Sequence, residues 1–590
     1  MDDVRHHSFQ AACIAKGLLE HDGEWISCLE EAAHMQTGHQ LRVLFVTILM
    51  MGHPSDPTDL WMRFCANVCD DLGEYLRRRG FVDLDIEQVY DYGLYLLEKM
   101  LISQNSSLQH KGMPQFQTDW GQRLGDVNSL IAEQYAYDTQ YEAQKVVEMQ
   151  RHLNPKQRDA FDKIVHAVER KAGISFFLNG SGGTGKTHLY QLLCHYFRSK
   201  PCIVLCVAST GIASLLLEGG RTAHLRFHIP LDIKENSVCD IRKNSKEADL
   251  IHQTELVIFD EVSGLHVHCL NAVERMFRDI IGGHRPFGGV TFLLGGDFKQ
   301  ILPVIVKGNR ADVVAACAQQ AAWWGHLEVL HLTQNMRVGP EPEEQEFARW
   351  QVEVGEGKHT DNEGNILIPP KFHCAQNTAQ CLITAIYPSL HSLRPAHCEN
   401  DQFFAERIIL SARNSDVDEL NLLMLNQFPG QIRQYHSADT VADFEHGDNE
   451  MYPTEYLNSI EMSGLPLATL KLKVGVPVIV MRNLAPSNGV CNGTRGIVTQ
   501  LSNTVVEIRL ISGSHAGEKF FVPRIKMNST KVDIPFTMQR LQFPLRLAFA
   551  MSINKSQGQS VQHVGLDLRS PVFTHGQFYV GISRATSCNR

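Results

Sequence analysis

The sequence predicts an α/β protein built on a parallel β-sheet, and three observations support this prediction. The apolar run Ile174–Leu178 leads into a glycine-rich turn and then into a segment with helical apolar periodicity. Later apolar runs of similar length end in polar residues, as buried parallel strands do at a ligand-binding edge. The 590 residues are 43% hydrophobic and 20% charged, which is typical of a soluble globular protein with several domains.

Composition restricts the class of protein. A net charge of −10 argues against bulk coating of nucleic acid, but it leaves room for a local basic groove. The 15 cysteines show no paired framework, and the N-terminus lacks the apolar core of a secretion signal. We therefore expect an intracellular location, the nucleus first and the mitochondrion as the alternative. The most apolar run, Val43–Met51, is too short to span a bilayer, so we expect no membrane partner.

The glycine-rich turn has the spacing G-x-x-x-x-G-K-T of a phosphate-binding loop. Its glycines let the backbone bring N–H groups around a polyphosphate, and the following helix adds its positive N-terminal end. Lys186 would contact the β- and γ-phosphates, and the hydroxyl of Thr187 would bind Mg²⁺. The predicted nucleotide-binding residues of this loop are Gly180, Ser181, Gly182, Gly183, Thr184, Gly185, Lys186 and Thr187.

Polar residues follow the next predicted strands. The strand Leu256–Phe259 ends in Asp260 and Glu261, and carboxylates at the end of a buried strand are costly unless they meet a cation. We predict that Asp260 holds Mg²⁺ and that Glu261 positions or activates the attacking water. After the strand Val290–Leu294, Gln300 is suited to sense the γ-phosphate through hydrogen bonds. The alternative interpretation of each strand end, taken alone, is an ordinary loop between a strand and a helix.

A helix precedes the phosphate-binding loop. Asn154 is a good N-cap and Pro155 fits the first helical position. Gln157 follows in the first turn, and its amide offers the donor and acceptor needed to recognise adenine. Residues 1–150 show mostly helical periodicity and no catalytic constellation, and the histidines near the N-terminus, His6 and His7, are predicted to face solvent.

Several motifs in order resemble the ATP-dependent DNA helicases of superfamily one, group B, of the Pif (petite integration frequency) type. The similarity is greatest to the branch carried by Helitron transposons, and it covers most of the chain from Leu153 onward. The matching segments are LNPKQRDAF (153–161), GSGGTGKT (180–187), ASTGIASLLLEGGRTAH (208–224), FDE (259–261), ERMFRDI (274–280), GGDFKQILPV (295–304), LTQNMR (332–337), INKSQGQS (553–560) and YVGISRA (579–585).

The resemblance implies a fold of two RecA-like P-loop NTPase domains with a small SH3-like β insertion and a mostly helical N-terminal region. The implied boundaries are 1–150 for the helical region, 151–340 for the first RecA-like domain, 341–405 for an irregular linker, 406–495 plus 545–590 for the second RecA-like domain, and 496–544 for the insertion.

The resemblance also implies roles for single residues. Lys186, Glu261 and Gln300 would act in catalysis, with Arg337 and Arg584 as arginine fingers, because a rigid guanidinium matches the charge on transferring phosphoryl oxygens. Gly558 would join the nucleotide-binding residues. Single-stranded DNA would contact Thr210, His224, Phe227, Phe298, Pro303, Asn554, Lys555 and Gln557, through backbone contacts and base stacking.

The expected activity is ATP hydrolysis with Mg²⁺ coupled to 5′–3′ translocation on single-stranded DNA and unwinding of forked DNA, by a monomer. The expected tasks are DNA repair, recombination, telomere maintenance or transposition. The chain departs from the family pattern at Val262–His266, at Glu274 and at Leu225, and it stops at Arg590, soon after the last motif. A shortened second domain that binds nucleotide or DNA without unwinding is therefore the alternative. A small-molecule kinase is disfavoured because it leaves the C-terminal motifs unexplained.

Two further groups have competing interpretations. The basic residues of the insertion would face DNA or form an ordinary solvated surface; they are Lys519, Arg524, Lys526, Lys531, Arg540 and Arg546. A second group would be buried free thiols or, as the alternative, a zinc site; it comprises Cys374, Cys381, His397 and Cys398.

Overall fold

The computed structural model describes residues 22–585 and 587, except for 36, 82–83, 125–127, 340, 395–398, 442–451, 463, 530–533 and 535. The predicted positions of His6, His7, Lys531, His397 and Cys398 lie outside the described residues.

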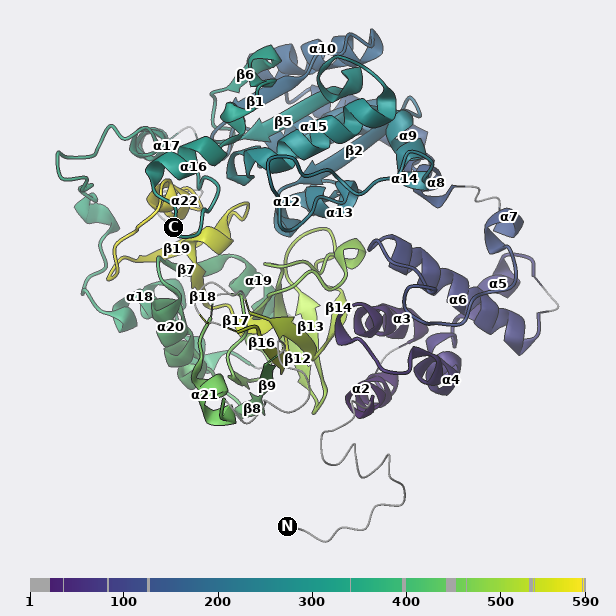
Figure 1. Ribbon diagram of the computed structural model, residues 1–590. Coiled ribbons are helices and arrows are strands. Elements are labelled where there is room, and N and C mark those ends of the chain that lie inside the picture. Colours follow the sequence, from purple (N-terminus) through teal and green to yellow (C-terminus); the bar gives the residue numbers. More distant parts are fainter. Residues whose placement is uncertain are drawn as a thin grey trace.

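A six-stranded parallel sheet forms the centre of the first α/β domain, with strand order β3-β2-β4-β5-β1-β6 (Figure 1). The predicted apolar runs became strands within two residues of their expected ends. The strands are β1 (Phe176–Gly180), β2 (Ile203–Ala208), β3 (Arg221–Thr222), β4 (Thr254–Asp260), β5 (Thr291–Gly296) and β6 (Glu328–Leu332). Because they run parallel, β1, β4 and β5 place the phosphate-binding loop, Asp260 and the turn after Gly296 at one edge of the sheet.

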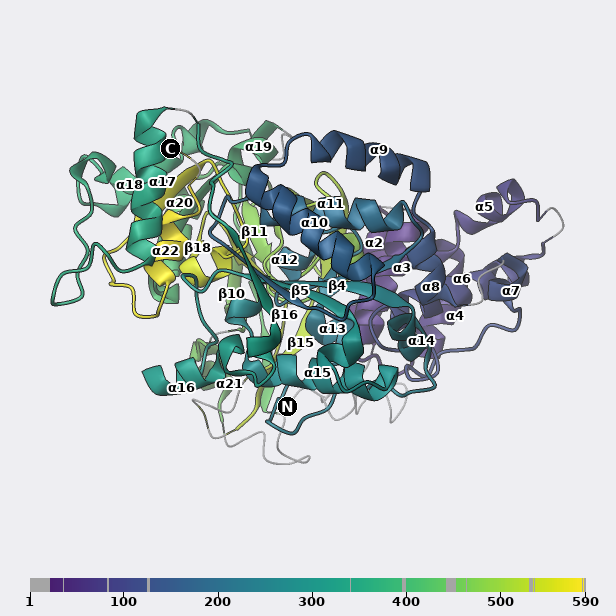
Figure 2. The same ribbon diagram turned by 90° about the horizontal axis from the view of Figure 1, so that it is seen from above.

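Helices cover both faces of this sheet. Alternate residues of β1 point to opposite sides, so Phe176 packs among α10 and α11, whereas Phe177 packs in the other layer with α15. Figure 2 shows α9, α10 and α11 side by side on the first face. The helices of the domain are α10 (Pro155–Glu169), α11 (Lys186–Arg198), α12 (Gly211–Ser214), α13 (Ala223–Phe227), α14 (Lys246–His252), α15 (Val267–Ile281) and α16 (Arg310–Ala316).

The second α/β domain has a smaller parallel sheet, of order β18-β7-β19 among the described residues. Its strands are β7 (Arg407–Ser411), β18 (Ala550–Ser552) and β19 (His563–Asp567), and its helices include α20 (Asn414–Gln427) and α22 (Gln577–Ile582). The segment predicted to be an irregular linker instead holds α17 (Pro342–Gly355), α18 (Ala379–Ile386) and α19 (Glu399–Ala405). Of these, α18 packs on β19 and β7 and so extends the second domain.

The β insertion is larger than predicted. The strands of residues 433–480 do not extend the second parallel sheet; they pair antiparallel with one another or with strands later in the chain. The physical reason is the loop of residues 481–494, which brings the Gly493 N–H to the Val480 carbonyl at 2.7 Å and so folds the chain back to pair β11 with β12. The elements are β8 (Arg433–His436), β9 (Ala438–Val441), α21 (Thr454–Ser459), β10 (Thr469–Leu472), β11 (Pro477–Val480), β12 (Arg495–Leu501), β13 (Val505–Leu510), β14 (Lys519–Pro523), β15 (Ile525–Asn528), β16 (Met538–Gln542) and β17 (Leu545–Leu547).

The predicted helical region divides into two parts. The helices α2–α7, called the N-terminal module here, share a hydrophobic core with Val505 and Phe521 of the insertion. Figure 1 shows this module beside β13 and β14. The next two helices instead pack on the first domain, where the Glu142 carboxylate contacts His195 Nδ1 at 2.6 Å. The helices are α2 (Gly23–Ala33), α3 (Gly38–Thr47), α4 (Pro57–Val68), α5 (Leu72–Arg78), α6 (Ile86–Ile102), α7 (Trp120–Leu124), α8 (Ser129–Tyr135) and α9 (Thr139–Gln150).

Within the described part of the chain, no helix combines the length and the apolar character needed to cross a membrane.

Candidate functional site

The phosphate-binding loop joins β1 to α11. Gly183 and Gly185 both have left-handed backbone conformations, with φ of 84° and 83°. A Cβ atom at Gly183 would lie 2.4 Å from Asn335 Oδ1, so a side chain there would displace the Asn335 side chain after β6. Lys186 Nζ donates a hydrogen bond to the carbonyl of Gly180 at 2.5 Å, which holds the ammonium group above the loop. The loop therefore has the geometry that a polyphosphate requires.

Of the other predicted loop residues, some hold the shape of the loop and others line the cleft. Thr184 is buried, and its hydroxyl donates to the Ser181 carbonyl at 2.8 Å. Ser181 and Gly182 line a small cavity of about 20 Å³ together with Arg337 and with Tyr579 from the second domain. Because this cavity has walls from both α/β domains, the loop faces the cleft between them.

Gln157 is held beside the loop by two hydrogen bonds. Its Oε1 accepts from the Asn154 N–H at 3.0 Å in a capping box, and its Nε2 donates to the Thr184 carbonyl at 3.1 Å. The side chain is 1% exposed. In this geometry the amide connects the start of α10 to the phosphate-binding loop. Each end of the amide keeps one further hydrogen-bonding position, and contact with adenine stays a prediction.

Asp260 and Glu261 lie at the end of β4, and both are buried. Asp260 Oδ1 accepts from the Glu261 N–H at 2.9 Å and from the Tyr190 hydroxyl at 3.3 Å. Burial raises the pKa of Asp260, while the charge of Lys186 opposes the rise. Burial, together with the charge of Asp260, raises the pKa of Glu261 to about 7. Two buried carboxylates beside a phosphate-binding loop indicate a site that is completed by a cation.

The residues present fit Mg²⁺. Magnesium is usually held by one or two carboxylates, with waters and substrate phosphates as the other ligands. Asp260 supplies such a carboxylate, and Thr187 supplies a hydroxyl from the first turn of α11. Among the described residues no group of three or more His, Cys, Asp or Glu side chains could hold a metal alone. The donor set therefore suits a metal that arrives with a nucleotide.

Gln300 lies in the turn after β5. The side chain is 3% exposed, and its Oε1 is buried without a hydrogen-bond partner. Its N–H donates to the Asp297 carbonyl at 3.0 Å, which fixes the turn. A buried acceptor without a partner costs about 1–3 kcal/mol. This cost is removed when a donor, such as a water beside a γ-phosphate, enters the site.

The two predicted arginine fingers have different surroundings. Arg584 is buried, and its guanidinium donates to the carbonyls of Val580 and Gln559 at 3.0 and 2.8 Å. Burial lowers the pKa of Arg584, whereas the nearby Glu261 carboxylate raises it. Arg337 is exposed, follows β6 in the first domain, and donates to the Ser560 hydroxyl of the second domain at 2.6 Å. Both guanidinium groups lie near the cleft, and contact with a phosphate stays a prediction for each.

The loop after β18 brings second-domain residues to the same cleft. Gln557, predicted to contact DNA, donates from Nε2 to Glu261 Oε2 at 3.3 Å. Asn554 Oδ1 accepts from Gln577 Nε2 at 3.0 Å. Burial lowers the pKa of Lys555 to about 8, and the nearby charge of Arg546 lowers it as well. Gly558 follows in a left-handed conformation with φ of 81°.

Two of the predicted DNA contacts are wrong in this structure. Phe227 is fully buried, with its ring 5.5 Å from that of Phe277 in the core of the first domain. Pro303 is also buried. Phe298 is half-buried against Phe177 and Trp324, so only part of its ring is available for stacking. The aromatic pattern that indicated base stacking instead builds the protein core.

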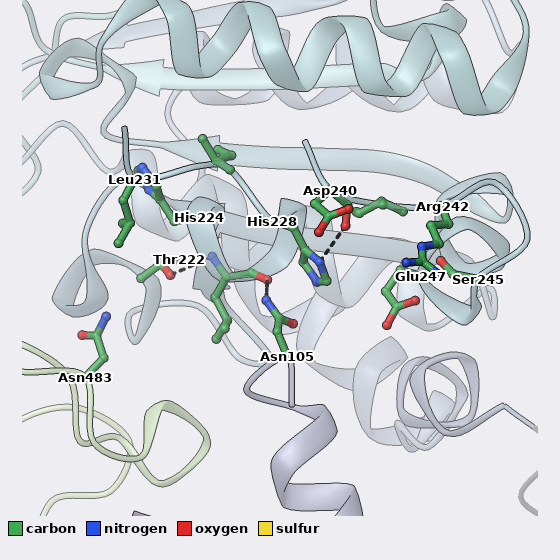
Figure 3. A pocket seen from close by; sticks show the side chains of 13 residues that line it. Asn105, Thr222, His224, His228, Leu231, Asp240, Arg242, Ser245, Glu247 and Asn483 are labelled. Atoms are coloured by element: carbon green, nitrogen blue, oxygen red, sulfur yellow. Dashed lines mark hydrogen bonds between the residues drawn. The ribbon is translucent and has the colours of Figure 1, made fainter. Parts of the chain in front are cut away.

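Thr210 and His224 remain accessible. Thr210 is exposed at the N-cap of α12, and its hydroxyl accepts from the Ala213 N–H at 3.3 Å. His224 lines a groove of about 640 Å³ with Thr222 and with Asn483 of the insertion (Figure 3).

The third wall of this groove belongs to the N-terminal module. Asn105, which is labelled in Figure 3, lines the groove and donates from Nδ2 to the Leu225 carbonyl at 3.0 Å. Sequence patterns did not identify Asn105 or Asn483, because neither belongs to a motif and the groove forms only when three parts of the chain meet.

The basic residues of the insertion are mostly paired. Arg540 is 1% exposed and forms an ion pair with Asp439 at 2.6 Å. Arg546 pairs with Asp418, Lys519 lies 3.0 Å from Glu507, and Arg524 lies 3.8 Å from Glu24 of the N-terminal module. The predicted DNA-facing patch is therefore wrong for Arg540, because its charge is neutralised in the interior. Of the predicted zinc group, Cys374 is exposed rather than buried and Cys381 is half-buried.

Comparisons with known proteins agree with this geometry. The family model described as PIF1-like helicase matches residues 152–365, and the model for the 2B domain of DNA helicase Pif1 matches residues 455–501. The second match begins within the enlarged insertion, before the predicted start at 496.

Relatives are found among curated proteins and solved structures. The ATP-dependent DNA helicase PIF1 of Homo sapiens is 28% identical over 422 residues, covering 70% of this chain and 57% of that protein. The Danio rerio protein of the same name is 28% identical over 424 residues, covering 70% and 58%. The chain thus spans less than three fifths of the length of these relatives.

The crystal structure of Pif1 helicase from Candida albicans is 27% identical, with a TM-score of 0.51, and the match covers 74% of this chain and 93% of that chain. A structure of Bacteroides Pif1 bound to single-stranded DNA, 24% identical with a TM-score of 0.51, has the same fold. The phosphate-binding loop and the acidic end of β4 lie within residues 152–365, so the chain is similar to the PIF1-like helicases over the part that holds these groups.

Proposed function

We propose that this protein is an ATP-dependent DNA helicase, which hydrolyses ATP in the cleft between its two α/β domains and moves along single-stranded DNA. The observation that carries the proposal is the contact of Gln557 with Glu261, because it joins a DNA-motif loop of one domain to the predicted catalytic acid of the other. Similarity to known proteins supports the same activity, since the matched relatives are named ATP-dependent DNA helicases.

In this proposal, each residue of the site has a separate role in ATP hydrolysis. Lys186 would bind the β- and γ-phosphates, and Asp260 with Thr187 would hold Mg²⁺, which would neutralise charge on the phosphate oxygens. Glu261 would accept a proton from the attacking water, while Gln300 Oε1 would orient that water. Arg584 and Arg337 would stabilise the charge that develops on the transferred phosphoryl group.

Movement on DNA would follow from closure of the cleft. The segments Thr210–Ser214 and Asn554–Gln557 belong to different domains, so a change in the cleft changes the spacing of two DNA contacts. The exposed Thr210, the groove beside His224 and the partly buried Lys555 support single-stranded and forked DNA as substrates. A 5′–3′ direction, action as a monomer, a nuclear location and a task in repair, recombination, telomere maintenance or transposition belong to the same proposal.

The test is unwinding of tailed duplexes of both polarities with ATP and Mg²⁺. The wild-type chain is expected to release a strand from the 5′-tailed duplex, and Lys186→Ala is expected to abolish both strand release and DNA-stimulated ATP hydrolysis. Lys163→Ala is a matched control, since Lys163 forms only surface ion pairs with Asp159 and Glu328. Full activity of Lys186→Ala would refute the site.

A binding module without unwinding is the second candidate. It is favoured by the small second sheet, of three strands among the described residues. DNA binding and ATP binding without strand release on any tailed duplex would establish this candidate instead.

A further inference from the structure

The turn after β5 and the start of α22 are held together at three points, although they belong to different α/β domains. His575 Nε2 donates to the Phe298 carbonyl at 3.0 Å. The backbone at Gly576 lies so close to Gln300 that a Cβ atom there would meet the Gln300 carbonyl at 2.5 Å. The Tyr579 hydroxyl donates to Asp297 Oδ2 at 2.9 Å.

The hydrogen bond between Tyr579 and Asp297 is shielded from water. Tyr579 is 4% exposed and Asp297 is 1% exposed. Burial raises the pKa of Tyr579, so the phenol keeps its proton and remains a donor at neutral pH. A hydrogen bond from a neutral donor to a buried carboxylate is among the stronger ones in proteins.

Each end of this hydrogen bond leads to a group predicted to act on the γ-phosphate. On one side, the Asp297 carbonyl accepts from the Gln300 N–H and so sets the position of the sensing turn. On the other side, α22 continues to Val580, whose carbonyl accepts from Arg584 Nε at 3.0 Å. Tyr579 also lines one small cavity with Ser181 of the phosphate-binding loop.

We propose that Tyr579 is a positioning residue, which through Asp297 sets the relative placement of Gln300 and Arg584 around the γ-phosphate. This inference rests on the proposed ATP hydrolysis. In this proposal Tyr579 does not touch the reacting atoms. Its hydroxyl holds the turn that contains Gln300, in the first domain, and the helix α22 that precedes Arg584, in the second, in one arrangement. Loss of the hydroxyl would leave ATP binding intact and slow the chemical step.

The test uses Tyr579→Phe, which keeps the ring against Gly355 and removes only the hydroxyl. We expect kcat for DNA-stimulated ATP hydrolysis to fall about tenfold, with KM for ATP and the affinity for single-stranded DNA unchanged within about twofold. Tyr196→Phe is the matched control, because the Tyr196 hydroxyl donates to the Glu169 carboxylate on an exposed surface of the first domain. The control is expected to keep wild-type kcat.

A double-mutant cycle separates positioning from general damage. Asp297→Ala alone should lower kcat, and adding Tyr579→Phe should produce little further loss, because both changes remove the same hydrogen bond. If Asp297→Ala does not fold, the kcat and KM of Tyr579→Phe alone test whether Tyr579 is a positioning residue.

Wild-type kcat in Tyr579→Phe, a loss confined to KM, or additive losses in the cycle would overturn the inference. Absence of DNA-stimulated hydrolysis in the wild-type protein would instead refute the proposed function, so the two failures are distinguishable.

Discussion

Gln557 Nε2 donates a hydrogen bond to Glu261 Oε2 at 3.3 Å, and this bond crosses the cleft between the two α/β domains. Glu261 lies at the end of β4 in the first domain. Its backbone is left-handed, with φ of 56°, a conformation that is unfavourable for residues other than glycine. The hydrogen bond from Gln557 therefore links the position of the second domain to Glu261, the residue predicted to activate water. A change in the cleft alters the environment of this carboxylate directly.

The first prediction concerns pH. A base must be deprotonated to act, and burial with the Asp260 charge raises the pKa of Glu261 to about 7. Because kcat/KM reports the free enzyme, kcat/KM for ATP should fall as the pH decreases through about 7. Gln557→Leu removes a hydrogen bond that favours the carboxylate, so it should move this acid limb to higher pH.

The measurement is the pH profile of DNA-stimulated ATP hydrolysis at constant ionic strength. Gln427→Leu is the control, because its amide contacts Gln380 on the surface of the second domain. An acid limb that stays at the same pH in Gln557→Leu would show that the observed pKa does not belong to Glu261.

The second prediction distinguishes the two arginines. Arg584→Ala removes a buried guanidinium together with its hydrogen bonds to the carbonyls of Val580 and Gln559, so it should lower the free energy of unfolding by about 3 kcal/mol as well as abolish ATP hydrolysis. Arg337→Ala removes an exposed side chain that contacts Ser560, so it should reduce ATP hydrolysis with little loss of stability. Denaturant unfolding and ATPase rates of both variants check this contrast. Equal stabilities of the two variants would contradict it.

The first domain and its nucleotide site follow from local sequence. The glycine spacing of the phosphate-binding loop and the acids after β4 are encoded within a few residues, and the sheet brings them together because parallel strands end at one edge. Asn154 likewise caps α10 as its residue type predicts. These features need no information about distant parts of the chain.

Long-range pairing explains what local sequence did not predict. Nothing near Arg540 indicates that its partner is Asp439, about a hundred residues away, and only the pairing of β16 with β9 makes this arginine internal. From sequence alone, Phe227 fits a base-stacking site and a hydrophobic core equally well. Its burial depends on packing against Phe277. The larger insertion has the same cause, since β11 alone does not reveal that its neighbours are β12 and β17.

The third prediction tests the position of Phe227. Since its ring is fully buried, Phe227→Ala should lower the free energy of unfolding by about 3–5 kcal/mol. Phe227→Leu keeps most of the apolar volume and should retain most of the stability. The affinity of folded Phe227→Leu for single-stranded DNA, measured by fluorescence anisotropy, should equal that of the wild type. A selective loss of DNA affinity in Phe227→Leu would restore the base-stacking role.

The last prediction concerns the junction of the N-terminal module with the insertion. The Glu31 carboxylate accepts hydrogen bonds from the backbone N–H groups of Asn503 and Thr504, at 3.3 and 3.0 Å, and from the Thr504 hydroxyl at 2.8 Å. Glu31→Ala removes all three acceptors, so the amides of 503–504 should exchange with solvent about 10- to 100-fold faster. Hydrogen exchange measured by mass spectrometry on peptides of the 501–506 turn tests this.

Glu30→Ala, at the neighbouring exposed position, should leave the exchange unchanged. Unchanged exchange at 503–504 in Glu31→Ala would show that the shared core around Val505 and Phe521 holds the junction without this carboxylate.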